Sequence, residues 1–226
     1  MNERSFVKKL EKAYLKEGFY TKKEIGVGYG IADLVLFRPN IQNCLKRLSY
    51  KQLKPLLNEG YFKIFNLLPD IETNKKPTKL DNLKIKVHYS SSFLKYKLLK
   101  DLKKAKYIKE VSGNYYFKIN GWLPIGKELI AIEAKLKDWK RGFYQANRYR
   151  MFANKSYLAV PSNIVNLVDI TILKKHGVGL IAFDMNNNTK RTLLEARKKE
   201  IFSTTKRNYA SEYFWNLDLR KGLISN

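Results

Sequence analysis

The stretch Glu128-Leu-Ile-Ala-Ile-Glu133-Ala-Lys135-Leu-Lys-Asp138 predicts the central strand of the fold. Its apolar run, Leu129–Ile132, is typical of a buried strand. Glu133 and Lys135 interrupt that run, and side chains two residues apart on a strand share a face. A buried charge is costly unless it is paired or bound to a metal. The pattern therefore indicates either an ion pair at a strand end or a functional site.

A second apolar strand with a single acid lies upstream, Gly28-Tyr-Gly-Ile-Ala-Asp33-Leu-Val-Leu-Phe37. The elements Ile31-Ala32-Asp33 and Glu133-Ala134-Lys135, with a helix after the second, resemble the PD-(D/E)XK nuclease superfamily, which has the restriction-endonuclease-like fold. The proline that usually precedes the aspartate is absent. The resemblance covers about residues 1–40 and 127–190, and Gln145-Ala-Asn-Arg-Tyr149 resembles the Gln-x-x-x-Tyr element of one branch.

The resemblance implies a Mg²⁺ or Mn²⁺ site. The metal ligands would be the carboxylates of Asp33 and Glu133 and the carbonyl of Ala134, in keeping with the preference of Mg²⁺ for oxygen. Lys135 would orient the attacking water and stabilise the transition state. Gln145 would position water or metal near the lysine, which makes Asp33, Glu133, Lys135 and Gln145 the expected catalytic set.

Three further residues are candidate accessory groups. Tyr149 lies four residues after Gln145, on the same helical face. Packing of that helix on the sheet is the alternative role for both side chains; it is as well supported as a site role for Tyr149, whereas for Gln145 the site role is favoured. Some relatives carry a metal-supporting glutamate at the position of Glu3, but Glu3 is expected first as a partner of the helix dipole. Glu24, on the strand before Asp33, is a further minor candidate.

The composition points to a polyanionic partner. Forty-five Lys and Arg face twenty Asp and Glu, a net charge of +25, and such a field attracts polyanions. Nucleic acid is the leading expectation, although a membrane surface or a ribosomal protein would also suit the charge. No apolar run has the length of a membrane span, the polar N-terminus shows no signal peptide, and the lone Cys44 excludes an internal disulfide. We therefore expect an intracellular, cytoplasmic protein.

The two acidic strands are too far apart in the sequence for a loop to join them in a compact domain. Residues 3–18 are expected to form a helix, and 20–27 and 31–38 two strands. An inserted domain over residues 41–126 would then divide a nuclease-like core made of residues 1–40 and 127–226.

The insert has a pattern of its own. Residues 43–67 are expected to be helical with a break, 80–87 and 92–105 to be helices, and 107–111 and 115–119 to be strands joined by the turn Ser112-Gly-Asn114. This order resembles a winged helix-turn-helix domain. Such a fold places its recognition helix in the major groove of DNA, and it can also serve protein contacts. The expected DNA-binding residues are Ser91, Ser92, Lys95, Tyr96, Lys97 and Lys100.

The rest of the chain alternates helices and strands. Helices are expected over 138–152, from Ser162 to Gly177 and over 194–225, and strands over 156–160, 178–184 and 189–193. The predicted fold class is α/β, with a restriction-endonuclease-like mixed sheet flanked by helices on both faces and an inserted winged helix.

These features predict a Mg²⁺-dependent DNA endonuclease acting on duplex or branched DNA. The alternative is a DNA-binding regulator or architectural protein on a nuclease-like fold without catalysis, and a nuclease or binder of structured RNA is a third. Restriction, junction resolution, transposon-end cleavage and repair all remain open, and a homodimer is compatible with each.

Overall fold

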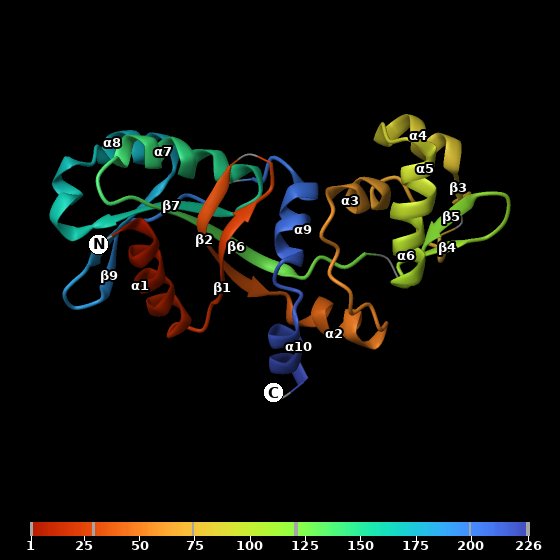
Figure 1. The fold of residues 1–226 in the computed structure, drawn as a ribbon, viewed down its shortest axis with the longest axis horizontal. Helices are drawn as coiled ribbons and strands as arrows, with labels where there is room; N and C mark the ends of the chain where they lie inside the picture. Colours follow the sequence, from red (N-terminus) through yellow and green to blue (C-terminus); the bar gives the residue numbers. More distant parts are fainter. Residues whose placement is uncertain (1, 29, 74, 120–121, 199, 225–226) are drawn as a thin grey trace. The chain divides into compact units, whose positions relative to one another are not determined.

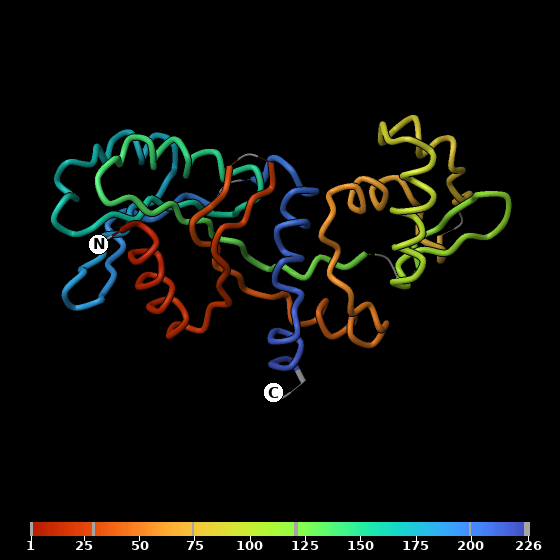
Figure 2. Tube along the Cα trace, viewed as in Figure 1, coloured from red at the N-terminus to blue at the C-terminus, as the bar shows by residue number. Residues whose placement is uncertain are grey.

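The computed structural model describes residues 2–28, 30–73, 75–119, 122–198 and 200–224. The chain divides into two compact units. Unit 1 contains Met1–Pro39 and Gly126–Phe214, and unit 2 contains Asn40–Ile125 and Trp215–Asn226. The chain therefore passes between the units after residues 39, 125 and 214, and Figure 2 shows the course of the chain along the sequence.

A six-stranded mixed sheet forms the centre of unit 1. Its strand order is β1-β2-β6-β7-β8-β9, in which β6, β7 and β8 are parallel and the remaining neighbours are antiparallel. The strands are β1 (Tyr20–Gly26), β2 (Ile31–Pro39), β6 (Gly126–Ala134), β7 (Lys155–Pro161), β8 (Gly179–Asp184) and β9 (Thr189–Leu194). The acidic strands β2 and β6 are direct neighbours, although the whole of residues 40–125 separates them in the sequence.

Helices cover both faces of this sheet (Figure 1). On one face, α1 (Glu3–Leu15) buries Phe6, Leu10 and Tyr14 against alternate residues of β2 and β6. On the other face, α7 (Trp139–Arg148) and α8 (Ile170–His176) pack over Leu158 and neighbouring strand residues. The helix α9 (Thr204–Glu212) contacts β6. The mixed α/β class predicted from the sequence is confirmed.

Two predictions for the C-terminal half are wrong in detail. The helix expected from Ser162 is the short 3₁₀ segment η3 (Ser162–Leu167), and α8 begins only after Asp169, whose carboxylate accepts hydrogen bonds from two backbone amides of the first turn. The single helix expected over 194–225 is two short helices, α9 and α10 (Leu217–Ile224), preceded by irregular chain. Residues 199 and 225 of that segment lie outside the described residues.

Unit 2 contains a three-stranded antiparallel sheet and a set of short helices. The strand order is β3-β5-β4. In chain order the elements are α2 (Ile41–Ser49), α3 (Glu59–Phe65), β3 (Thr78–Lys79), α4 (Leu80–Val87), α5 (Ser91–Phe93), the π-helical segment η1 (Leu94–Leu99), α6 (Lys100–Lys104), β4 (Ile108–Glu110), β5 (Tyr115–Lys118) and α10. The segments α5, η1 and α6 follow one another directly, so residues 91–104 form one helix, close to the prediction for 92–105.

The C-terminal residues group with unit 2 rather than with the core to which the sequence analysis assigned them. The ring of Trp215 is fully buried, lies 4.6 Å from the guanidinium of Arg47 and donates a 2.9 Å hydrogen bond to the carbonyl of Gln52. Arg220 adds a 2.8 Å bond to the carbonyl of Leu53. These contacts join Trp215 and Arg220 to residues 47–53 of unit 2, although both residues follow α9 closely in the sequence.

No helix in the described ranges has both the length and the apolar character that a membrane span requires.

Candidate active site

Lys135, the residue after β6, lies at the centre of the candidate site. Its Nζ is 2.7 Å from a carboxylate oxygen of Glu133, 3.5 Å from one of Glu3 and 3.9 Å from one of Asp33. Glu133 is fully buried and Lys135 is 8% exposed. The structure thus brings together three of the four residues expected to be catalytic, and it adds Glu3, for which the sequence favoured a dipole role. The fourth, Gln145, forms no hydrogen bond or ion pair with them in the described part of the chain.

The carboxylate of Asp33 lies where the β2–β6 ladder ends. The last paired residues at this end are Leu34 and Ile132. Beyond them, Asp33 Oδ2 accepts a 2.8 Å hydrogen bond from the amide of Ala134, so a side chain replaces the missing strand neighbour. The amide of Lys135 bonds instead to Ala159 of β7. The carbonyl of Ala134 and the amide of Lys135 belong to one trans peptide group and point in opposite directions. Because the Lys135 amide points to β7, the carbonyl of Ala134 points to the side of Asp33.

Burial and neighbouring charges set the protonation of these groups. Burial raises the pKa of Asp33, against the Ala134 amide and Lys135, which lower it, and Glu3 and Glu24 raise it further. Burial also raises the pKa of Glu133, opposed by hydrogen bonds from Lys135 and Tyr149. Burial alone would lower the pKa of Lys135, but its hydrogen bond to Glu133 and the surrounding carboxylates raise it. Lys135 is therefore a cation, and the two acids hold their charge less readily than exposed carboxylates do.

Helix α7 encloses the site from one face of the sheet. A Cβ placed on Gly142 would lie 2.6 Å from Cγ of Lys135 and 2.7 Å from Cδ1 of Leu158. The lysine stem therefore occupies the space that any other residue at position 142 would need. The sequence analysis did not identify Gly142, although a glycine inside a predicted helix is a signal for close packing.

Tyr149 belongs to the 3₁₀ turn η2 (Tyr149–Met151) that follows α7, and it is buried. Its hydroxyl contacts the carboxylate of Glu133 and lies 2.8 Å from the carbonyl oxygen of Ile31. Burial, followed by the charge of Glu133, raises the pKa of Tyr149 well above its usual range, so the hydroxyl acts as a neutral donor. Gln145 lies between Gly142 and Tyr149 on α7, and its amide oxygen is buried with no hydrogen-bond partner among the described residues.

Glu24 occupies an unusual backbone position in β1. Its φ is +57°, in the left-handed region that glutamate rarely adopts. The β1–β2 register pairs Lys23 with Leu34 and Ile25 with Ala32, and it leaves out Glu24 and Asp33. A cavity of about 120 Å³ is lined by Glu3, Arg4, Val7, Lys23, Glu24 and Asp33. Both accessory glutamates therefore share a cavity with Asp33.

The donor set is compatible with a hard divalent cation. Three carboxylates around one ammonium leave two formal negative charges, and Asp33, Glu133 and the Ala134 carbonyl supply oxygen donors. Mg²⁺ is often held by one or two carboxylates with water and substrate completing its shell. In the described part of the chain, no three His, Cys, Asp or Glu side chains form a group that could hold a metal ion by themselves. Asp33 and Glu133, with the carbonyl of Ala134, are the residues here that could supply oxygen ligands.

The residues predicted to bind DNA lie on the helix of residues 91–104 in unit 2. Ser91, Ser92, Lys95, Tyr96, Lys97 and Lys100 are all exposed. The opposite side of this helix buries Leu94, Leu98 and Leu102, and the π-helical segment also buries Leu99. Tyr96 is 68% exposed, and Lys97 pairs with Asp101 at 3.3 Å.

Comparison of the chain with family models, with curated proteins and with solved structures finds no match.

Proposed function

We propose that this protein is a metal-dependent endonuclease that hydrolyses phosphodiester bonds in DNA. The observation that carries the proposal is that the carboxylates of Asp33 and Glu133, from two strands far apart in the sequence, both lie within 4 Å of the ammonium nitrogen of Lys135. Structure alone gives little reason for this arrangement, because buried ion pairs contribute little net stability. Together with the net charge of +25, it suits chemistry on a polyanion.

Asp33, Glu133 and the carbonyl of Ala134 would hold Mg²⁺ or Mn²⁺. When bound, that ion activates water and stabilises charge on the phosphate. Lys135 contributes a fixed positive charge beside the scissile phosphate and donates hydrogen bonds to its oxygens or to the attacking water. Tyr149 and Gly142 fix the positions of Glu133 and Lys135, and a preorganised ammonium needs no rearrangement during the reaction.

We further propose that the core is related to the PD-(D/E)XK fold and that unit 2 is a winged helix. The order helix, strand, helix, helix and two-stranded hairpin over residues 59–118, with β5 between β3 and β4, supports the second proposal. Residues 91–104 would be the recognition helix. Residues 41–126 carry 18 Lys and Arg against 6 Asp and Glu, which favours nucleic acid over protein as the partner of this helix.

A panel assay tests the proposed function. Purified protein is incubated with Mg²⁺, with Mn²⁺ or with EDTA, and with plasmid, linear duplex, branched and single-stranded DNA and structured RNA. We expect metal-dependent cleavage of at least one DNA substrate. Cleavage of RNA alone would contradict the DNA assignment.

A non-catalytic DNA-binding protein is the second candidate, because the net charge of +25 and the exposed lysines of residues 91–104 would serve DNA binding without catalysis. Tight DNA binding without cleavage under any metal condition would favour it. For either candidate, Lys95→Ala with Tyr96→Ala should weaken DNA binding, since each exposed side chain would lose a phosphate or base contact.

A further inference from the structure

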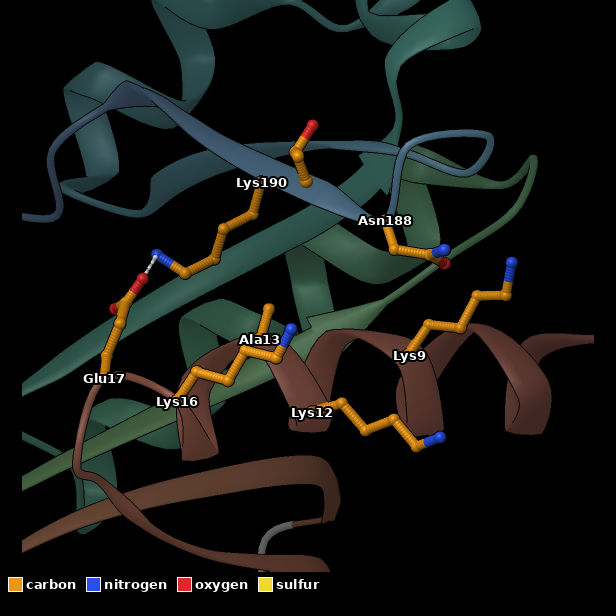
Figure 3. A pocket seen from close by; sticks show the side chains of 8 residues that line it. Lys9, Lys12, Ala13, Lys16, Glu17, Asn188 and Lys190 are labelled. Carbon is orange, nitrogen blue, oxygen red and sulfur yellow. Dashed lines mark ion pairs between the residues drawn. The ribbon is translucent and has the colours of Figure 1, made fainter.

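A lysine-lined groove lies between α1 and β9 in unit 1 (Figure 3). Its volume is about 630 Å³. Its lining residues are Lys9, Lys12, Ala13, Lys16, Glu17, Asn188, Thr189 and Lys190. Four lysines and one glutamate give this groove a formal charge of +3.

The internal contacts of the groove neutralise only part of this charge. Lys190 pairs with Glu17 at 2.8 Å, so these two charges cancel. Lys9 donates a 3.1 Å hydrogen bond to the carbonyl of Met185 and keeps its full charge. Within the described chain, Lys12 and Lys16 make no ion pair, and both are exposed. Lys9 and Lys12 of α1 and Lys16 at its C-cap thus lie together, and in the described chain none of the three is paired with a carboxylate.

The three ammonium groups repel one another. Lys9, Lys12 and the C-cap residue Lys16 are spaced three and four residues apart, and like charges at this spacing are unfavourable on a helix. The opposite flank of α1 shows the contrast, since Glu11 there pairs with Lys23 of β1 at 2.7 Å. An anionic ligand in the groove would remove the repulsion.

The length and position of the lysine row match a nucleic-acid backbone. From Lys9 to Lys16 the helix rises about 10 Å, the axial rise of about three nucleotides of one B-form strand. The same helix begins at Glu3, whose carboxylate lies 3.5 Å from Lys135 Nζ, about 9 Å of helix before Lys9. Helix α1 therefore contributes residues both to the groove and to the candidate active site.

We propose that the α1–β9 groove binds the phosphodiester backbone of the substrate strand next to the cleavage site, through Lys9, Lys12 and Lys16. This inference rests on the proposed function for the identity of the partner. It assigns to the core a DNA-binding surface separate from the residue 91–104 helix of unit 2, so the core holds one strand of its substrate itself.

The test uses two double variants of the full chain. The groove variant carries Lys12→Gln and Lys16→Gln together, and the matched control carries Lys174→Gln and Lys175→Gln together. The control pair is exposed on α8, which packs on the opposite face of the sheet, and it removes the same charge. Binding to labelled duplex and to single-stranded DNA is measured by fluorescence anisotropy over a salt series. The slope of log K against log salt is negative. In the groove variant it should be less steep by about 1.8 for duplex, or by about 1.4 for a single strand, because each of the two lost phosphate contacts contributes about 0.9 or 0.7 to its magnitude.

The outcomes separate this inference from the proposed function. A groove variant that matches the control in affinity and slope overturns the inference, whether or not the wild-type protein cleaves DNA. If the wild-type protein never cleaves DNA but the predicted slope change occurs in the groove variant only, the result supports DNA binding by the groove and contradicts the proposed nuclease function. A slope change confined to one DNA form shows whether the bound strand is single or part of a duplex.

Discussion

Lys135 is positioned by charge at its ammonium group and by packing along its aliphatic stem. Its Nζ contacts carboxylates from α1, β2 and β6, whereas its stem lies against Gly142 of α7. Because each acid comes from a different element, the electrostatics of the site depend on the correct assembly of the whole core.

The first prediction concerns pH and metal. Because burial raises the pKa values of Asp33 and Glu133, the folded state favours their protonated forms. In metal-free buffer the stabilisation that comes from protonated Asp33 and Glu133 is complete below the ordinary carboxyl pKa of about 4. This stabilisation is lost as pH rises through the raised pKa values of the folded protein. A cation that binds the ionised forms should therefore raise Tm more at about pH 8 than at about pH 5.

This prediction is measured as Tm with EDTA and with excess Mn²⁺ at each pH. Asp33→Asn combined with Glu133→Gln should abolish the metal effect at both. An increase that is the same at both pH values, or that persists in the double variant, would place the metal elsewhere.

The second prediction concerns Tyr149→Phe. The hydroxyl contacts buried Glu133 and the carbonyl of Ile31, so its loss should cost about 1–3 kcal/mol of unfolding free energy. It also removes a hydrogen bond that lowers the pKa of Glu133, so the acid limb of the pH–rate profile should move to higher pH.

Tyr144→Phe is the matched control, because Tyr144 on the preceding helix α7 is 66% exposed. It should change neither stability nor the pH profile. Equal effects of the two substitutions would show that the Tyr149 hydroxyl does not act on Glu133.

At the scale of elements, α7 sets the position of the lysine through a glycine. Gly142→Ala would gain about 1 kcal/mol of helix propensity. The new Cβ, however, would lie 2.6 Å from Lys135 Cγ and 2.7 Å from Leu158, and overpacking costs about 1–3 kcal/mol. We expect lower Tm together with a loss of activity larger than that of Lys140→Ala, an exposed control on the same helix. Full activity at reduced Tm would show that catalysis does not depend on the position of Lys135.

The sequence predicted this site where periodicity and charge were sufficient. Alternation placed Glu133 and Lys135 on one face, and α7 contacts both through Gly142 and Tyr149. The left-handed backbone of Glu24 depends on neighbouring elements, and no local pattern encodes it. A glycine inside a predicted helix signals close packing, but it does not show that the stem of Lys135 lies against Gly142. Likewise, the sequence indicated helix formation near the C-terminus, but the burial of Trp215 in unit 2 depends on Arg47, which is remote in the sequence.

At the scale of the whole molecule, the junctions between the units are close together within the core. Pro39 and Gly126 are partners in the β2–β6 ladder, as expected if residues between them form an insert. The C-terminal junction follows Phe214, whose ring stacks on Phe37 at 4.5 Å. A core without unit 2 must therefore keep Phe214 and lose the residues after it.

We predict that joining Pro39 to Gly126 through a short glycine-containing turn, and ending the chain at Phe214, gives a soluble core. It should keep metal-dependent hydrolysis, because every proposed catalytic group lies in unit 1, and it should lose much of its duplex affinity. The matched control keeps residues 215–226 and should be less soluble, since Trp215 would lose its burial site beside Arg47. Sedimentation and the cleavage panel measure both proteins. A core with undiminished duplex affinity would contradict the role given to unit 2.

The most direct test of the central claim is the rate of plasmid nicking by the wild-type protein, Asp33→Asn and Lys135→Ala, each with Mg²⁺ and with EDTA. The account predicts nicking by the wild-type protein only with metal, and losses of at least about 100-fold in both variants, whose far-UV circular dichroism and DNA affinity should stay close to wild type. Nicking at the wild-type rate by either folded variant, or nicking that EDTA does not suppress, would contradict it.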